Sequence, residues 1–153
     1  MATNENDEDE DHYIVLVHGF QASRQDFIVL KNCLEIRFKT KVFISTCNEG
    51  RTDDDLETQG KIFALELQRF LNDSAPSFNY KLSFIGHSMG GIIIRTALCY
   101  LENIDEHLYS YISFSTPHLG YLYEPSTHIQ AGLWLLGALQ KTTSIEQICV
   151  RDK

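Results

Sequence analysis

Short apolar runs alternate along this chain with longer segments of helical periodicity. The runs at residues 12–17, 41–47, 81–87 and 109–115 are rich in apolar residues and show little polar alternation, as expected for parallel strands covered on both faces. Between them, apolar residues recur every three or four positions, which predicts helices. This order predicts an α/β fold. We expect a three-layer sandwich in which a parallel sheet of about four strands, joined by right-handed crossovers, carries helices on both faces.

The predicted helices have recognisable start signals. Ser23 followed by Asp26 resembles a capping box, and the helix after it has an apolar face made of Phe27, Leu30, Leu34 and Phe38. Thr52 and the acids at 53–55 supply a cap and first-turn charges for the next helix, whose buried face comprises Leu56, Phe63, Leu67, Phe70 and Leu71. Gly60 within this helix is expected to allow close packing. Two more helices are predicted over residues 129–139 and 144–150.

Charge divides the chain into two parts. The 153 residues favour one domain, and the formal net charge is −8. Six of the 21 acids precede His12, in a stretch without Lys or Arg. We therefore expect residues 1–11 to be an acidic disordered tail and residues 12–153 to form the domain. A nucleic-acid partner is not expected, because no basic stripe with interleaved aromatics is present.

Several classes of protein are disfavoured. No apolar stretch is long enough to span a bilayer, and the polar acidic N-terminus does not have the pattern of a signal peptide. The four widely spaced cysteines favour reduced and mostly buried thiols, and therefore the cytoplasm. Neither G-x-G-x-x-G nor a P-loop lysine accompanies the glycines near residue 90. The acidic triplet 53–55 is better explained as helix capping than as a metal site, so no metal and no cofactor are expected.

The strongest chemical signal is the segment Gly86-His87-Ser88-Met89-Gly90. An apolar strand precedes it and an apolar helix follows. The two outer glycines permit a sharp turn and close packing of strand against helix. Ser88 would then stand at a helix N-terminus, where free N–H groups favour a developing negative charge. This context predicts a nucleophile elbow, and an ordinary strand–helix turn is the alternative.

Three motifs follow three of the predicted strands, namely His18-Gly19-Phe20, the segment around Ser88, and residues 115–120 (Ser-Thr-Pro-His-Leu-Gly). In this order the chain resembles an α/β-hydrolase. More narrowly, it resembles the lipase-like "putative serine esterase" family of eukaryotes, represented by the C-terminal hydrolase domain of large "family with sequence similarity" proteins. Further matching segments are 45–48, 52–53, 93–95 and 132–135. The resemblance covers nearly all of residues 13–152.

The resemblance implies a role for each motif residue. Ser88 would be the nucleophile, and the backbone N–H groups of Phe20 and Met89 would form the oxyanion hole. The loop and the elbow would be shaped by His18, Gly19, Gly86, His87 and Gly90. For the two histidines, a structural role in orienting the turn is favoured over proton transfer.

The triad itself is incomplete in this sequence. In this fold the acid and the histidine follow the serine in chain order. About 65 residues follow Ser88, and no further strand followed by Asp or His is visible among them. We therefore expect a truncated domain with impaired activity, in which no histidine reaches Ser88. The best-placed substitute base is His118, and the remaining titratable alternatives are His128, Asp105, Glu106 and Glu124.

Two functions follow from these observations. The first is a serine esterase or lipase that acts on an ester or lipid small molecule through an acyl-enzyme on Ser88, with peripheral membrane contact left open. The apolar stripe Ile129, Leu133 and Leu136 would then be a lid or an acyl-binding wall, or alternatively cover for the sheet. The second is a non-catalytic binding or scaffold module with the same fold and unspecified protein partners.

Overall fold

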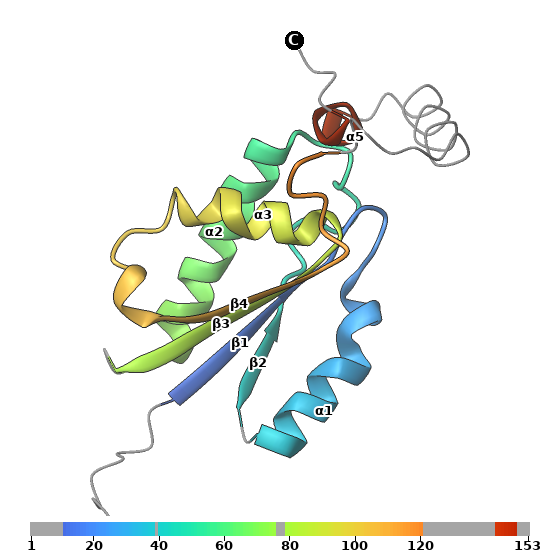
Figure 1. The fold of residues 1–153 in the computed structure, drawn as a ribbon. Coiled ribbons are helices and arrows are strands. Elements are labelled where there is room, and N and C mark those ends of the chain that lie inside the picture. Colours follow the sequence, from blue (N-terminus) through green and yellow to red (C-terminus); the bar gives the residue numbers. More distant parts are fainter. Residues whose placement is uncertain (1–10, 39, 76–78, 121–142, 150–153) are drawn as a thin grey trace, which may run out of the picture.

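A four-stranded parallel sheet organises the molecule, as the sequence predicts. The computed structural model describes residues 11–38, 40–75, 79–120 and 143–149. The strands are β1 (Asp11–Val17), β2 (Lys41–Ile44), β3 (Tyr80–His87) and β4 (Leu108–Phe114). They lie in the order β2-β1-β3-β4, and every neighbouring pair is parallel (Figure 1). The two long apolar runs β1 and β3 therefore occupy the centre.

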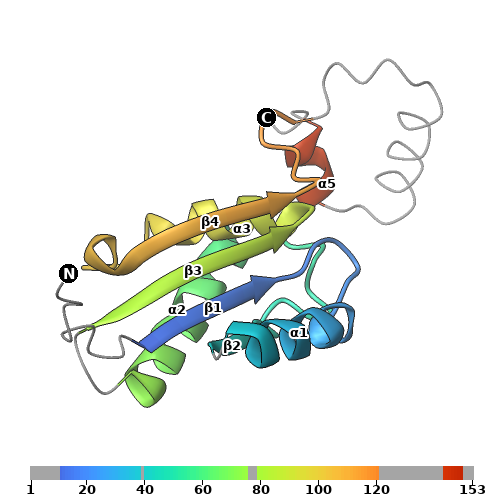
Figure 2. The same cartoon turned by 60° about the horizontal axis from the view of Figure 1, so that its bottom comes forward.

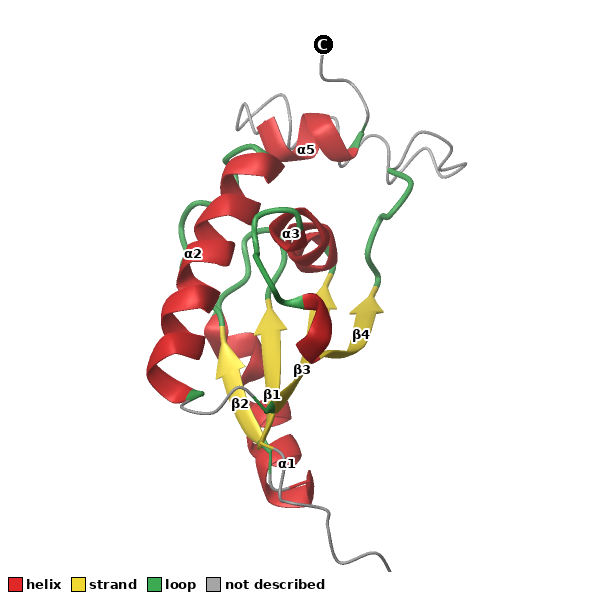
Figure 3. Ribbon diagram, turned by 90° about the vertical axis from the view of Figure 1, so that its left-hand side faces the viewer, coloured by secondary structure: helices red, strands yellow, loops and turns green. Residues whose placement is uncertain are grey.

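Helices lie on both faces of this sheet. A 3-10 turn (Arg24–Phe27) leads into α1 (Ile28–Phe38) on one face, and α2 (Leu56–Ser74) and α3 (Met89–Leu98) lie on the other (Figure 1). A second 3-10 turn, η2 (Asp105–His107), precedes β4, and the short helix α5 (Thr143–Ile148) follows later in the chain. Figure 3 shows that all four strands point the same way, toward the edge where α3 begins. The fold class is thus confirmed.

The core is divided unequally by the sheet. On β1, Tyr13, Val15 and Val17 belong to the cluster on the α2 and α3 side, whereas Ile14 and Leu16 belong to the cluster on the α1 side. The first cluster has 15 buried members and the second only 5. Helix α2 packs closely on α3 because Gly60 has no Cβ atom, as expected for that glycine. A Cβ atom there would lie 2.5 Å from Thr96 Cγ2. Most of the buried apolar side chains therefore lie between the sheet and helices α2 and α3.

Several predicted boundaries are wrong. The second strand ends at Ile44 rather than Cys47, because the N–H groups of Thr46 and Cys47 donate to the Glu66 carboxylate instead of a strand ladder. The first strand begins at Asp11 rather than His12, and the Asp11 carboxylate forms an ion pair with Lys41 at 2.8 Å. Phe38, expected on the buried face of the first helix, is 61% exposed.

The cysteines also differ from expectation. All four thiols are free, but Cys33 and Cys99 are exposed and only Cys149 is buried. The predicted helix over residues 129–139, with its apolar stripe, lies outside the described residues, as do His128, Glu124 and residues 1–10 of the tail. Among the described helices, none has the length and apolar character needed to cross a membrane.

Asp55 is the N-cap of α2, so its carboxylate is expected to stabilise this helix. Its side chain accepts a hydrogen bond from the Thr58 N–H at 2.9 Å, and hydrogen bonds from the side chain and backbone of Thr58 lower the pKa of Asp55. We expect Asp55→Ala to lower the free energy of unfolding by about 1 kcal/mol at pH 7. Asp55→Asn, which keeps an acceptor oxygen, should retain most of the stability.

Because the folded-state pKa is lowered, the charged cap stabilises the protein above the unfolded-state pKa of about 3.9, and this contribution is lost as the pH falls through the folded-state value. Urea denaturation at pH 7 and pH 3 measures it. The difference between wild type and Asp55→Asn should shrink at pH 3. A difference that is unchanged by pH would show that the carboxylate charge has no part in the cap.

Candidate active site at the carboxyl ends of the strands

Ser88 is the single residue between β3 and α3. Its backbone has φ 53° and ψ −125°. Residues other than glycine rarely adopt this combination, which costs about 1–3 kcal/mol. The surrounding backbone holds it there, since the Ser88 N–H donates to the Phe114 carbonyl of β4 at 2.8 Å. The side chain is half-buried and makes no capping hydrogen bond to α3. The hydroxyl is therefore held on a tight turn without being used by the helix.

Two glycines make this turn possible by close approach. A Cβ atom at Gly86 would lie 2.6 Å from the Gly91 Cα atom, and a Cβ atom at Gly90 would lie 2.1 Å from the Val17 carbonyl oxygen. Both obstacles are backbone atoms, which cannot rotate away. The start of α3 is thus packed directly on the ends of β3 and β1.

The loop after β1 lies against Ser88. A Cβ atom at Gly19 would lie 2.8 Å from the Ser88 Cβ atom and 3.2 Å from its Oγ atom. Phe20 follows Gly19 directly, and Met89 follows Ser88 at the N-terminus of α3. Among the described residues, no group accepts a hydrogen bond from the N–H of Phe20 or of Met89. The structure therefore brings the hydroxyl and two unpaired amides to the same strand ends.

The two histidines of the motifs are placed differently. His18 is buried, at 2% exposure, and its Nδ1 atom lies 3.1 Å from the Gly19 carbonyl oxygen. A carbonyl only accepts, so Nδ1 is the donor and carries the proton. The His18 Nε2 atom is buried and has no hydrogen-bond partner in the described part of the chain. The His87 side chain, by contrast, is exposed.

His118, the substitute base considered above, is engaged elsewhere. Its Nδ1 atom lies 3.2 Å from an Arg95 Nη atom, and its Nε2 atom lies 2.9 Å from the Ser113 hydroxyl. A guanidinium only donates, so Nδ1 accepts and the proton of the neutral ring is on Nε2. In the part of the chain that the structure covers, no histidine ring is hydrogen-bonded to Ser88.

The alternative acids are far from the serine. Asp105 and Glu106 lie in η2, before β4 begins, whereas Ser88 binds the last residue of β4. The acidic triplet 53–55 has structural roles, since Asp55 caps α2 and Asp54 pairs with Arg51 at 2.8 Å. No group of three potential metal ligands is found among the residues described here.

Comparisons with known proteins agree with this geometry. The family described as "Putative serine esterase (DUF676)" matches residues 7–153. The chain belongs to this putative serine esterase family. Its fold is a partial α/β-hydrolase fold, as the resemblance of the sequence implies.

Solved structures show the same fold at low sequence identity. The mature lipase BlEst2 of Bacillus licheniformis is 21% identical, with a TM-score of 0.64 over 98% of this chain and 60% of that one. Phospholipase PlaB of Legionella pneumophila is 15% identical, with a TM-score of 0.66 over 90% of this chain and 32% of that one. An extracellular α/β-hydrolase of a Paenibacillus species is 12% identical, with a TM-score of 0.55 over 85% and 52%. The chain therefore spans less than two thirds of each of these proteins.

Glu66 of this serine esterase homologue is a supporting residue that the sequence did not reveal. From α2, its carboxylate accepts hydrogen bonds from the Ser45 hydroxyl at 2.6 Å and from the N–H groups of Thr46 and Cys47 at 3.0 and 3.1 Å. It thereby fixes the loop after β2. In the sequence it is only one glutamate on an amphipathic helix, and nothing in its spacing pairs it with residues 20 positions earlier.

Thr52 is a second supporting residue. Its hydroxyl accepts from the Gln21 N–H at 3.0 Å, and its carbonyl accepts from the Ser144 hydroxyl at 2.7 Å and the Gln59 amide at 3.2 Å. Gln21 has φ 51° and directly follows Phe20. Thr52 therefore ties the loop that presents the Phe20 amide to the loop before α2 and to α5.

The thiol of Cys47 is expected to be unreactive. Burial, together with the neighbouring Glu66 carboxylate, raises the pKa of Cys47 to about 12. At pH 8 a thiol with an ordinary pKa carries about a thousandfold more thiolate. We expect iodoacetamide at pH 8 to modify the exposed Cys99 at least about tenfold faster than Cys47, as measured by mass spectrometry of tryptic peptides. Equal rates would contradict the placement of Cys47 against Glu66.

Proposed function

We propose that this chain is a serine hydrolase of carboxylic esters, with Ser88 as the nucleophile. The observation that carries the proposal is the conformation of Ser88, which presents its hydroxyl beside Gly19 without capping α3, near two amides that have no acceptor among the described residues. Strained backbone of this kind persists where the surrounding structure enforces it, and such residues cluster at active sites. Membership of the serine esterase family supports the same chemistry.

The reaction would proceed in two steps. The Ser88 Oγ atom attacks the carbonyl carbon of the ester, and the carbonyl oxygen becomes an oxyanion that accepts hydrogen bonds from the Phe20 and Met89 N–H groups. The carbon–oxygen bond to the alcohol then breaks, the alcohol leaves with the proton that the Ser88 hydroxyl gave up, and an acyl-enzyme remains. Water hydrolyses this ester and restores the serine. Loss of one oxyanion donor typically costs about a hundredfold or more in rate.

The proposed reaction requires a base that removes the proton of the Ser88 hydroxyl. A serine hydroxyl without a general base is a poor nucleophile at neutral pH. No base contacts Ser88 within the described residues, and His118 is held by Arg95 and Ser113. Because no described acid or histidine contacts Ser88, we expect slow turnover of ordinary esters by this chain, while strongly electrophilic reagents still react.

A lipid substrate is the most consistent ester class. BlEst2 is a lipase and PlaB a phospholipase, and both share the fold of this chain. Leu119, which follows β4 at the same edge as Ser88, is 93% exposed. An apolar side chain in that position supports peripheral contact of this edge with a lipid surface.

A non-catalytic binding module is the second candidate. The observation that favours it is the absence of a histidine bonded to Ser88 in the described residues. Such a module would bind a lipid or a protein partner with the same affinity whether or not the Ser88 hydroxyl is present. Dependence of labelling or turnover on that hydroxyl separates the two candidates.

Fluorophosphonate labelling tests the role of Ser88. We expect the purified chain to be labelled slowly and Ser88→Ala to lose all labelling, because the proposed reaction makes the Ser88 Oγ atom the one that attacks phosphorus. Ser115→Ala is the matched control, since Ser115 also lies at the carboxyl end of a strand and also has a positive φ. Labelling that persists in Ser88→Ala, or that never occurs in folded protein, would refute the hydrolase proposal.

Gly19→Ala tests the space beside the hydroxyl. The new methyl group would lie 3.2 Å from the Ser88 Oγ atom and 2.9 Å from the His87 carbonyl oxygen. We expect the labelling rate to fall by about tenfold or more, with a modest loss of stability, because the loop must shift away from the oxyanion site. Circular dichroism at the labelling temperature checks that the variant is folded. An unchanged rate in folded protein would show that Gly19 and Phe20 do not border the reacting atoms.

A further inference from the structure

Half of one sheet face is bare among the described residues. On the α1 side, the helix lies over β1 and β2, and no described helix lies over β3 and β4 (Figure 2). On β4, Tyr109 is 63% exposed, Ile112 44% and Phe114 51%. Strands of parallel sheets are normally covered on both faces. This face therefore has the character of an interface.

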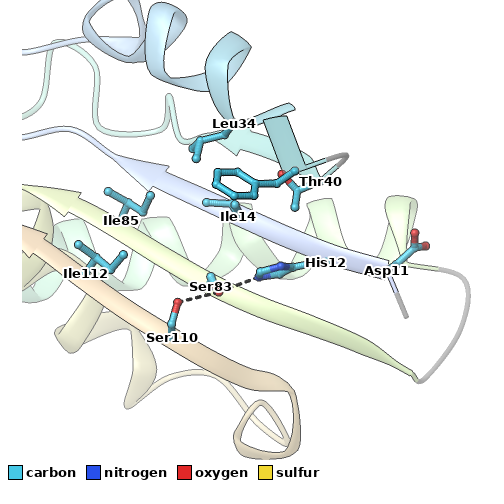
Figure 4. Close-up of a pocket in the computed structure, with 10 residues that line it drawn as sticks. Asp11, His12, Ile14, Leu34, Thr40, Ser83, Ile85, Ser110 and Ile112 are labelled. Atoms are coloured by element: carbon cyan, nitrogen blue, oxygen red, sulfur yellow. Dashed lines mark hydrogen bonds between the residues drawn. The ribbon is translucent and has the colours of Figure 1, made fainter. Parts of the chain in front are cut away.

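A groove runs along this bare half, between α1 and β4 (Figure 4). Its volume is about 650 Å³, its floor is Ile14 and Ile85, and its walls include Leu34, Phe38 and Ile112. The polar groups of the floor are paired with one another, since the Ser110 hydroxyl donates to Ser83 at 2.9 Å and Ser83 lies 2.8 Å from His12. Two strands are about 10 Å wide, which is the diameter of one helix. The groove therefore suits an apolar helix face.

Helix α1 itself carries such a face on its outer side. Val29 is 74% exposed, Ile36 is 83% exposed, and Cys33 between them is exposed as well. The spacing of four and then three residues places all three on one stripe. The inner side of the same helix, with Leu30 and Leu34, packs on the sheet. Within the described residues, an uncovered apolar stripe thus lies next to an uncovered apolar groove.

We infer that two copies of this chain form a symmetric dimer in which α1 of each copy fills the groove of the other. A two-fold axis parallel to the strands, placed between two facing sheets, produces this arrangement. Each α1 then lies between β1 and β2 of its own sheet and β3 and β4 of the partner subunit. One operation covers both grooves and both stripes, as a self-complementary two-fold interface requires.

Charges at the rim agree with this symmetry. Helix α1 connects two parallel strands, so its last turn, with Arg37, lies at the end where the strands begin. Asp105 and Glu106 of η2, just before β4, lie at the same end of the sheet. Within the described residues, none of these three forms an ion pair. An axis parallel to the strands keeps this end of both copies together, so Arg37 comes to the end of the interface where Asp105 and Glu106 of the partner subunit lie.

Sedimentation velocity of the full chain over a concentration series tests the inference. We expect a dimer, and we expect Ile36→Glu to weaken it by about a hundredfold, because the carboxylate would be buried without a partner. Ile36 is exposed in one copy, so the variant should remain folded, which circular dichroism checks. Leu65→Glu is the matched control: Leu65 is 54% exposed on α2, on the opposite side of the sheet, and its substitution should leave the dimer intact.

A charge exchange tests the orientation. Arg37→Glu should weaken the dimer, and adding Glu106→Arg should restore it, because the two side chains would meet across the interface. Alkylation gives an independent readout: Cys33 should react more slowly in the wild-type dimer than in Ile36→Glu, whereas Cys99 should react equally in both. A wild-type chain that stays monomeric overturns the inference, including the case in which the groove binds a fatty acid or another protein instead. A dimer that survives Ile36→Glu overturns it as well.

Discussion

The contact between the backbone at the start of α3 and the backbone at the ends of β1 and β3 is the constraint on which the site depends. It leaves no room for a Cβ atom at Gly86 or Gly90, and it forces the residue between them into a rare conformation. The N–H of that residue is bound to β4, so three strands meet at one serine. The apolar core between the sheet and helices α2 and α3 holds α3 against β1 and β3, and this packing maintains the strained backbone of Ser88.

Side chains from α2 and its N-terminal loop fix the other half of the site. Glu66 binds the loop after β2, and Thr52 binds the loop after β1, next to the amide of Phe20. In the proposed reaction, donors held in place in this way would not need to reorganise when charge develops, and such stabilisation is usually the largest single contribution to the rate. The serine and its amide neighbours are therefore ordered by polar contacts from outside the motifs, whereas the described residues supply no base.

The two faces of the sheet have different roles. The α2 and α3 side carries the large core and positions Ser88, while the α1 side has a small core and a groove over β3 and β4. The inferred dimer covers this groove on the face of the sheet opposite α2 and α3. Catalysis and association would then be separable properties of one sheet.

The sequence by itself determined the order of strands and helices, the elbow at Ser88, the Ser23 capping box and the close packing at Gly60, because each depends on neighbours a few residues apart. It misplaced the end of β2 and the exposure of Phe38, Cys33 and Cys99, which depend on what packs from elsewhere in the chain. Only the tertiary structure decided that His118 pairs with Arg95 and Ser113, and that Glu66 and Thr52 hold the loops. The physical reason is that hydrogen bonds between distant segments leave no periodic or local pattern in the sequence.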